Sequence, residues 1–386
     1  GGMEGESGMA NIYLVRHCES EGNACRRTQA QTDALVTTKG YLQNEMLRRR
    51  FRDIPIDGIY SSDAFRSIMT VEPIAKERGL PIRVRIHLRE VTTGVWEDMA
   101  WGNIAKEYPK ESKDWDEHPW ANTTPGASTF QQVADRLLFG LRRIAREVGD
   151  GNALCVSHSC TIKAGLCAMM GRPMSDVKVV GHGDNTSVSL IHVDREGNFS
   201  VEYMNDGSHL PPELRRAWSG VAGADINMAV DPVDLDKESE VLEELARAHA
   251  RQTEGAEVPF DGAEWLARAR ELTAYNPDYL AVCRLKGRPV GFVWMENEEE
   301  TPEDCGHVRT MFVLPELQGK GYTEQLFGYA AHVFRYQGKR VLTVSVPRLP
   351  EDQRVVERFT FSPMRGFRDR MALELFSPPC PYPILA

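Results

Sequence analysis

Between residues 10 and 205, short runs of apolar and β-branched residues alternate with longer stretches in which apolar side chains recur every three or four positions. The short runs have the length of strands, and the longer stretches have the period of amphipathic helices. Their alternation predicts βαβ units around a parallel sheet. The predicted strands are 11–15, 58–60, 83–86, 153–156 and 187–193, and the predicted helices are 39–51, 63–78 and 130–148.

The pattern changes after residue 205. Residues 206–225 are rich in Gly and Pro and carry only a short helical pattern around Leu214, so this stretch is predicted to be a linker. A second domain of mixed α+β structure is predicted over residues 226–377. Its elements are expected at 226–230 (strand), 235–251 and 262–273 (helices), 280–285, 289–295 and 307–313 (strands), 321–336 (helix) and 340–346 (strand).

Composition narrows the class of protein. The chain has 386 residues, of which 41% are hydrophobic, and a net charge of -10, which disfavours non-specific binding to nucleic acid or to an anionic membrane. No apolar run approaches the roughly 20 residues of a membrane helix, and the eight Cys form no C-x-x-C pair. We therefore expect a cytoplasmic protein with small-molecule partners. The sequence is compatible with either a monomer or a homo-oligomer. The Gly1-Gly2 start is expected to be a tag remnant, with a native start at Met3 or Met9.

The first predicted strand runs directly into Arg16-His17, and open α/β sheets bind ligands at the carboxyl ends of their strands. The segment Arg-His-Cys-Glu-Ser-Glu-Gly-Asn, which ends at Asn23, resembles the R-H-G-E-[ST]-x-x-N signature of the histidine phosphatase superfamily, also called the phosphoglycerate mutase-like family. Four further segments match family motifs in the right order: 33–43, 61–70, 88–97 and 156–158. The resemblance covers residues 10–205 and implies a three-layer α/β/α domain.

The resemblance assigns the catalytic roles. His17 would be the nucleophile that forms a phosphohistidine, since a neutral imidazole can attack phosphorus in line. Arg16 and Arg66 would hold the phosphate oxygens through forked donors, and His158, if protonated, would add a further cation. Glu90 would be the general acid. Two Arg and two His supply the positive charge, so no metal is expected.

Several nearby residues leave alternatives open. Glu97 and Asp98 lie close enough in sequence to take the role of Glu90. Asn23 would orient a phosphate oxygen or its own loop, and Ser159, where the family usually has Gly, would place a hydroxyl beside the substrate. Cys18 also replaces a family Gly and would pack under the phosphate loop or tune it. His182, in a Gly-rich turn, is expected to be an ordinary loop residue.

Aromatic residues cluster between Glu90 and His158, where the family places its substrate lid. They form either a small core of their own or an apolar lid over the organic part of the substrate, and we favour the lid. The segment is short compared with that of the mutase branch, which favours hydrolysis over phosphate return. The aromatic residues are Trp96, Trp101, Tyr108, Trp115 and Trp120.

A second candidate site follows the strand that ends at Val313. A Gly-rich turn leads from it into a helix, which presents backbone N–H groups to an anion. Together with the order of elements, the pattern V-x-P-x-x-Q-G-K-G resembles the acetyl-CoA loop of the GNAT acyltransferases, over residues 226–376. By this resemblance the cofactor is acetyl-CoA or another acyl-CoA. Its pantetheine would bind at Phe312 and Val313, and its pyrophosphate at Gln318, Gly319, Lys320, Gly321, Tyr322 and Thr323.

This second resemblance is incomplete. Thr323 stands where the family has Gly or Ala, and Phe359 and Phe361 stand near the position of the Tyr that protonates the CoA thiolate. Candidate bases for an amine acceptor are Glu303, Asp304 and His307.

The leading interpretation is a bifunctional enzyme that hydrolyses a small phosphorylated metabolite and acylates an amine. One alternative is a phosphatase whose GNAT-like domain is a non-catalytic CoA-sensing or dimerisation module. Another is a phosphotransferase of the phosphoglycerate mutase type. A protein with no catalysis is hard to reconcile with the full set of phosphatase residues.

Overall fold

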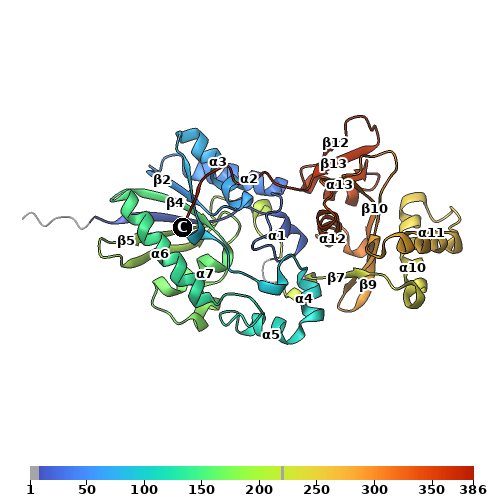
Figure 1. Ribbon diagram of the computed structural model, residues 1–386, viewed down its shortest axis with the longest axis horizontal. Coiled ribbons are helices and arrows are strands. Elements are labelled where there is room, and N and C mark those ends of the chain that lie inside the picture. The colour runs from blue at the N-terminus through green and yellow to red at the C-terminus, as the bar shows by residue number, and fades with distance from the viewer. Residues whose placement is uncertain (1–7, 219–220) are drawn as a thin grey trace, which may run out of the picture.

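The computed structural model describes residues 8–218 and 221–386. It contains two separate seven-stranded sheets, one in each predicted domain, and the domains lie side by side along the long axis of the molecule (Figure 1). The expected tag remnant and Met3 lie outside the described residues. No helix in the described part of the chain is long and apolar enough to cross a membrane.

The first sheet has the strand order β14-β3-β2-β4-β1-β5-β6. Its centre is parallel, because β1 pairs with β4 and β4 with β2 in the same direction, whereas β5 runs antiparallel to β1. All five predicted strands form, and β6 and β14 are additional. The strands are β1 (Ala10–Arg16), β2 (Gly58–Ser61), β3 (Ile82–Arg85), β4 (Asn152–Ser157), β5 (Val188–Val193), β6 (Phe199–Asp206) and β14 (Ile384–Leu385).

Helices cover both faces of this sheet, which confirms the three-layer prediction. Helices α2 and α3 pack on one face with Leu47 and Val71 in a common apolar cluster, and α6 and α7 pack on the other face with Leu137 and Leu166. The helices are α1 (Glu21–Cys25), α2 (Thr38–Arg50), α3 (Phe65–Arg78), α4 (Trp101–Glu107), α5 (Pro109–Glu117), α6 (Phe130–Val148), α7 (Ser159–Met169) and α8 (Val177–Val180).

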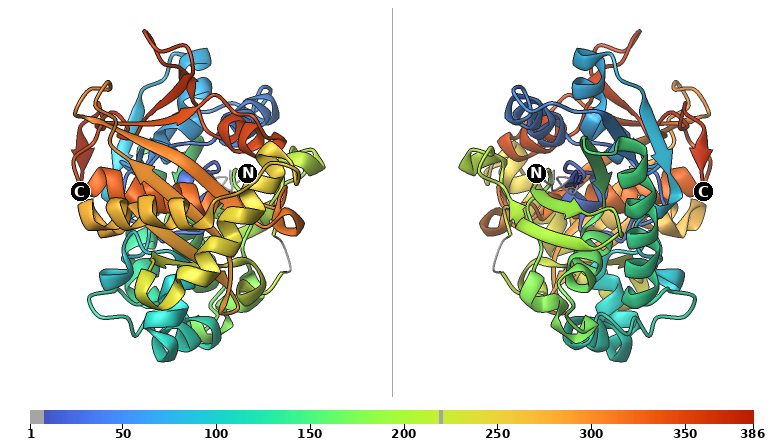
Figure 2. Two further views of the ribbon diagram at one scale, coloured as in Figure 1. Left: turned by 90° about the vertical axis from the view of Figure 1, so that its right-hand side faces the viewer. Right: turned by 90° about the vertical axis from the view of Figure 1, so that its left-hand side faces the viewer.

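The second sheet has the order β12-β13-β11-β10-β9-β8-β7. Helices α10 and α11 cover its outer face (Figure 2), and α12 lies between this sheet and the first domain (Figure 1). The strands are β7 (Ala229–Pro232), β8 (Leu280–Leu285), β9 (Arg288–Glu296), β10 (Cys305–Val313), β11 (Val341–Ser345), β12 (Ser362–Pro363) and β13 (Arg370–Glu374). The helices are α9 (Gly223–Ile226), α10 (Leu235–Glu254), α11 (Gly262–Tyr275), α12 (Thr323–Tyr336) and α13 (Pro350–Arg358).

The two domains share a hydrophobic core. Ala24 and Cys25 of α1 belong to the same buried apolar cluster as Phe327 and the inner face of the second sheet. Helix α12 approaches α1 so closely that a Cβ on Gly328 would lie 2.7 Å from the Cβ of Cys25. Because most domain interfaces within a chain are polar and small, a shared core indicates a fixed arrangement.

The predicted linker packs against the first domain around Leu214, whereas Trp218 and Asp225 contact Tyr322 of the second domain. Leu210 and Leu214 are buried, and the side-chain amide of Gln43 in α2 donates to the carbonyl oxygen of Leu214 at 2.8 Å. At the other end of the second domain the chain crosses back, and β14 pairs in parallel with β3 of the first sheet (Figure 1). The predicted boundary at 377 lies where this return begins.

Candidate active site and acyl-CoA loop

His17 lies at the carboxyl end of β1 with its ring buried. Its Nδ1 atom is 2.6 Å from the carbonyl oxygen of Cys18. A carbonyl oxygen can only accept a hydrogen bond, so Nδ1 carries the proton and Nε2 keeps its lone pair. Burial, together with the charges of Arg66 and Arg16, holds the pKa of His17 well below its usual value. His17 is therefore a neutral imidazole with a free nucleophilic nitrogen.

Two guanidinium groups stand beside this ring. Arg16 donates through Nη1 to the carbonyl oxygen of Gly183 at 2.6 Å, while its buried Nε has no partner among the described residues. Arg66 is held by the carbonyl oxygens of Thr32 and Ala30 at 3.3 and 3.1 Å. Burial and the nearby Arg216 lower the pKa of Arg16 to about 10, so it remains charged at neutral pH. An unpartnered buried donor next to His17 suits a phosphate oxygen.

His158, from the carboxyl end of β4, packs against His17 with 5.1 Å between ring centroids. Arg66 Nη2 lies 3.3 Å from its Nδ1, and Ser62 Oγ lies 2.8 Å from its Nε2. An Arg can only donate, so Nδ1 accepts and Nε2–H donates to the hydroxyl. Burial and Arg66 hold the pKa of His158 well below its usual value, so the third cation considered from the sequence is absent before an anion binds. A phosphate dianion would favour its protonation.

Of the three acidic candidates, only Glu90 lines the cavity that contains His17 in the described part of the chain. One carboxylate oxygen of Glu90 accepts from the backbone N–H of Thr161 at 3.0 Å, and the other accepts from that of Cys160 at 3.2 Å, so the group sits at the start of α7. Glu97 instead accepts from the Gln31 N–H, at 2.7 Å. Asp98 pairs with Arg27 and His332.

Asn23 and Asn185 connect the loop after β1 to the strand end. The Nδ2 group of Asn185 donates to the carbonyl oxygen of His17 at 3.0 Å and to Oδ1 of Asn23 at 3.2 Å. The hydrogen bonds of the Asn23 side chain within the described residues use only Oδ1, which leaves its Nδ2 for a ligand. Sequence reasoning missed Asn185.

His182 was expected to be an ordinary loop residue, but it lines the same cavity. Its Nδ1 contacts the hydroxyl of Ser159 at short range, and its Nε2 accepts from Lys163 Nζ at 3.0 Å. Lys163 is 8% exposed, and burial lowers its pKa. Ser159, predicted to face the substrate, is therefore the end of a Lys–His–Ser chain at the cavity wall. The Gly residues around His182 concealed this signal, since they resemble a plain turn.

Cys18 packs under the loop. Its N–H donates to Thr70 Oγ1 at 2.9 Å, and its Sγ lies 3.5 Å from the carbonyl oxygen of Arg66. Burial raises the pKa of the thiol to about 11, so it stays protonated and acts as a packing residue.

The cavity has a volume of about 540 Å³ and includes His17 at its base. Trp101 and Trp115 form part of its wall, and Trp96, 1% exposed, packs edge-on against both of them. The predicted aromatic cluster is thus a small core that also presents an apolar wall to the cavity. Part of the lining comes from beyond residue 206: Arg215, Arg216, Ala217, Trp218, Val221, Gly223, Ile226, Asn227 and Arg358.

Comparison with known proteins decides the family. The model of the histidine phosphatase superfamily (branch 1) matches residues 12–207, which include all five residues predicted to be catalytic. The chain belongs to the histidine phosphatase superfamily. The model of the acetyltransferase (GNAT) family matches residues 242–361, so the histidine phosphatase domain is fused to a GNAT domain.

The relatives that match the histidine phosphatase domain include proteins named as phosphatases and proteins named as mutases. Phosphoserine phosphatase 1 of Hydrogenobacter thermophilus is 28% identical over 202 residues, which are 52% of this chain and 95% of the relative. A probable phosphoglycerate mutase GpmB of Salmonella typhi is 31% identical over 165 residues, 43% of this chain and 77% of the relative. Among solved structures, Bacillus stearothermophilus YhfR superposes with a TM-score of 0.50 and 28% identity, over 52% of this chain and 98% of that chain.

The GNAT domain has the backbone that its family uses for acyl-CoA. Strands β10 and β11 pair only as far as Val308 and Val344, and β10 then continues to Val313 on the side of β9 alone. The two strands therefore diverge, and backbone groups of β10 near Phe312 face the gap. The loop after β10 leads into the N-terminus of α12.

Part of the expected pyrophosphate position is nevertheless occupied by a side chain of the protein itself. Glu351, from the first turn of α13 and 7% exposed, accepts from the Gly319 N–H at 2.9 Å and from Thr323 Oγ1 at 3.1 Å. A Cβ on Gly321 would lie 3.1 Å from the indole of Trp218, so Trp218 covers the loop. The Glu351 carboxylate, which Arg354 also holds at 2.6 Å, competes with a pyrophosphate for the N–H group of Gly319. The residues present do not fit the cofactor, and no acyl-transfer step follows from them.

The two Phe residues near the expected Tyr position are packing residues. Phe359 is 2% exposed and stacks on Phe327 of α12 with 4.1 Å between ring centroids, and Phe361 contacts the same ring edge-on. Neither Phe side chain carries a hydroxyl that could protonate a thiolate.

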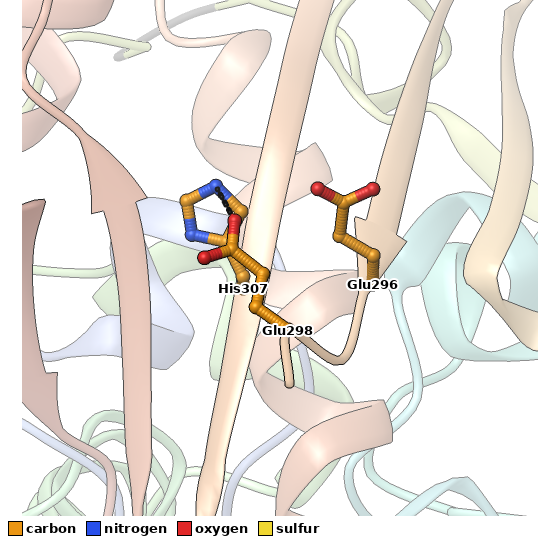
Figure 3. Close-up of side chains that lie close together, drawn as sticks. All are labelled: Glu296, Glu298 and His307. Atoms are coloured by element: carbon orange, nitrogen blue, oxygen red, sulfur yellow. Dashed lines mark ion pairs between the residues drawn. The ribbon is translucent and has the colours of Figure 1, made fainter. Parts of the chain in front are cut away.

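Two of the three candidate bases of the GNAT domain, His307 and Asp304, lie against charged side chains. Glu303 instead accepts from Lys339 Nζ through its backbone oxygen, at 2.8 Å. His307 Nε2 lies 3.3 Å from a carboxylate oxygen of Glu298, and Glu296 is close by (Figure 3). Arg370 donates to both oxygens of Glu298 at 2.7 and 2.6 Å, so a guanidinium already neutralises the cluster where a metal ion would have to. Asp304 pairs with a second guanidinium, that of Arg340.

Proposed function

We propose that this chain is a phosphomonoesterase that acts on a small metabolite in the cytoplasm through a phosphohistidine at His17. The observation that carries the proposal is the tautomer of His17: its Nδ1 proton is fixed on a backbone carbonyl, so Nε2 is free to attack. The unpartnered Nε of Arg16 supports a bound phosphate beside it.

The reaction has two displacements. Nε2 of His17 attacks phosphorus, the ester oxygen leaves, and Glu90 donates the proton that the leaving oxygen requires. Arg16 and Arg66 stabilise the charge on the transferred phosphoryl group. Water then attacks the phosphohistidine, Glu90 removes its proton, and His17 is regenerated with release of phosphate.

The experiment is to incubate the full chain with ³²P-labelled ester and to trap the protein. Wild type should carry an acid-labile, base-stable label and should release phosphate from p-nitrophenyl phosphate. His17→Ala should show neither the label nor turnover while keeping the same melting temperature within about 2 °C. Retained turnover in His17→Ala would refute the mechanism.

A mutase activity is the second candidate, because one relative is named a probable phosphoglycerate mutase. The short segment between Glu90 and His158 favours hydrolysis, since a mutase must retain the product while the phosphoryl group returns. Incubation with 3-phosphoglycerate separates the two: a phosphatase releases inorganic phosphate, and a mutase forms the 2-phosphate isomer.

The proposed role of the GNAT domain is to support the phosphatase site rather than to transfer acyl groups. GNAT membership implies acyl-CoA use and an amine acceptor for the family, but Glu351 occupies the anion position in this chain. Helices α12 and α13 instead bind the loop that follows His17, because Arg358 Nη2 donates to Glu19 at 3.0 Å and Arg335 pairs with Glu21 at 2.6 Å.

A further inference from the structure

Arg26 directly follows the last residue of α1 and lies at the cavity that contains His17. It has φ = 56°, a left-handed conformation that is unfavourable for a non-Gly residue and that is retained where the surroundings enforce it. Its carbonyl oxygen accepts from the Trp101 N–H at 3.0 Å, which fixes the backbone. The side chain lines the cavity together with His17.

The guanidinium of Arg26 is held by the second domain. Its Nε donates to Oδ1 of Asn227 at 2.9 Å, and within residues 8–218 and 221–386 no carboxylate is ion-paired with it. Its neighbours differ: Arg27 is paired with Asp98 and Lys39 with Glu19.

Burial lowers the pKa of Arg26. A half-buried cation without a counter-ion is costly. Retaining it in a cavity is consistent with a site for an anionic group.

That anion is not the phosphoryl group under attack, because Arg16 and Arg66 stand beside His17 for that purpose. Arg26 follows Asn23 by three residues, just beyond the end of α1, and both residues line the cavity that contains His17. Asn23 is itself linked through Asn185 to His17. A group bound at Arg26 thus lies in the same cavity as a phosphate bound at His17.

We propose that Arg26 and Asn227 form a subsite for a second anionic group of the substrate, a carboxylate or a second phosphate. With Nε bound to Asn227, both Nη groups of Arg26 remain for a bidentate contact. The amide Nδ2 of Asn227 supplies a further donor. The proposal rests on the proposed function, and it makes the fused domain a determinant of substrate choice.

The test measures binding, so that it does not depend on turnover. Calorimetry on the full chain compares methylphosphonate with phosphonoacetate, 3-phosphonopropionate and methylenediphosphonate, whose C–P bonds resist this chemistry. Wild type should bind at least one of the three ligands that carry a second anionic group 10-fold or more tightly than it binds methylphosphonate. Arg26→Met should reduce that ratio to within about 2-fold of one, and Arg26→Lys should restore part of it. The carboxylate and bisphosphonate arms identify the preferred group.

The control is Arg172→Met, which removes the same charge from an exposed pair with Asp176 outside the cavity. It should leave the ratio unchanged. Asn227→Ala should lower the ratio without affecting methylphosphonate. Equal ratios in wild type and Arg26→Met, or equal weakening of every ligand in Arg26→Met, would overturn the subsite. Failure of the proposed function would appear elsewhere, as absence of p-nitrophenyl phosphate hydrolysis or of the His17 label.

Discussion

Replacement of Arg335 by Met should destabilise the whole molecule, because it leaves a buried carboxylate unpaired between the domains. Arg335 Nη1 and Nη2 each donate to Glu21 at 2.6 Å, and the Glu21 side chain is fully buried. Met keeps most of the volume of the Arg stem, so the change removes the charge rather than the packing. The only hydrogen bond left to the Glu21 side chain within the described residues comes from Gln29, at 3.2 Å.

The expected cost follows from that burial. Removing one partner of a buried ion pair costs about 3–5 kcal/mol. With an unfolding entropy of about 2.1 cal/mol/K per residue, a cooperative unit of the whole 386-residue chain loses about 4–6 °C in melting temperature. If the second domain melted alone, one of two transitions would fall by roughly 10–15 °C. Calorimetry of wild type and Arg335→Met distinguishes these cases, and the shared core predicts one transition.

The matched control is the double variant Arg335→Met/Glu21→Gln, which neutralises the buried partner. It should recover at least about 1.5 kcal/mol relative to Arg335→Met, since a neutral amide is far cheaper to bury than a carboxylate. A melting temperature for Arg335→Met within 1 °C of wild type would contradict the reasoning. So would a double variant that is no more stable than Arg335→Met.

Three further predictions concern single carboxyl groups. Glu90→Gln should slow hydrolysis of alkyl phosphates about 100-fold or more but that of p-nitrophenyl phosphate by less than about 10-fold, because only the alkoxide needs a proton. The control Glu97→Gln should change both rates by less than about 3-fold, and equal slowing of both substrates by Glu90→Gln would exclude an acid role. CoA should leave the melting temperature of wild type unchanged but raise that of Glu351→Ala, and a rise in wild type would show that the loop accepts CoA as it stands. Burial and Glu351 raise the pKa of Asp352 to about 6, so its contribution to stability is present below pH 4 and is lost as the pH rises through 6. Asp352→Asn should therefore increase the free energy of unfolding by about 1–2 kcal/mol at pH 7.5 and not at pH 4, and an equal gain at both would refute this.

Local sequence patterns were sufficient for the centre of the first domain. Helix α6 forms over the predicted range, and the strand ends that carry His17 and His158 meet as expected, because parallel strands present their carboxyl ends at one edge. The sequence alone did not separate Glu90 from Glu97 and Asp98 as the general acid. The structure favours Glu90, because only its side chain, among these three, lines the cavity with His17 in the described residues.

Contacts between distant segments could not be predicted in this way. Glu351 and Gly319 lie on different elements, and nothing in the local pattern around either residue indicates that they meet. The same holds for Lys163 and His182, which are joined only by the folding of α7 against the following loop. A two-residue strand such as β14 carries too few residues for any periodicity.

The return of the chain to the first sheet changes how the two halves can be separated. The chain passes from the first domain through the packed linker to the second domain and returns to the first sheet at β14, where Ile384 lies opposite Val84, so segments on both sides of the second domain contact the first. Proteolytic nicking between residues 208 and 218 should therefore yield two fragments that co-elute, because the shared hydrophobic core and the β14–β3 pairing hold them together without a peptide bond. If the protein were produced as two halves divided at that linker, the first half would lack the edge strand β14. In the second half, β14 would lack β3, the strand with which it pairs.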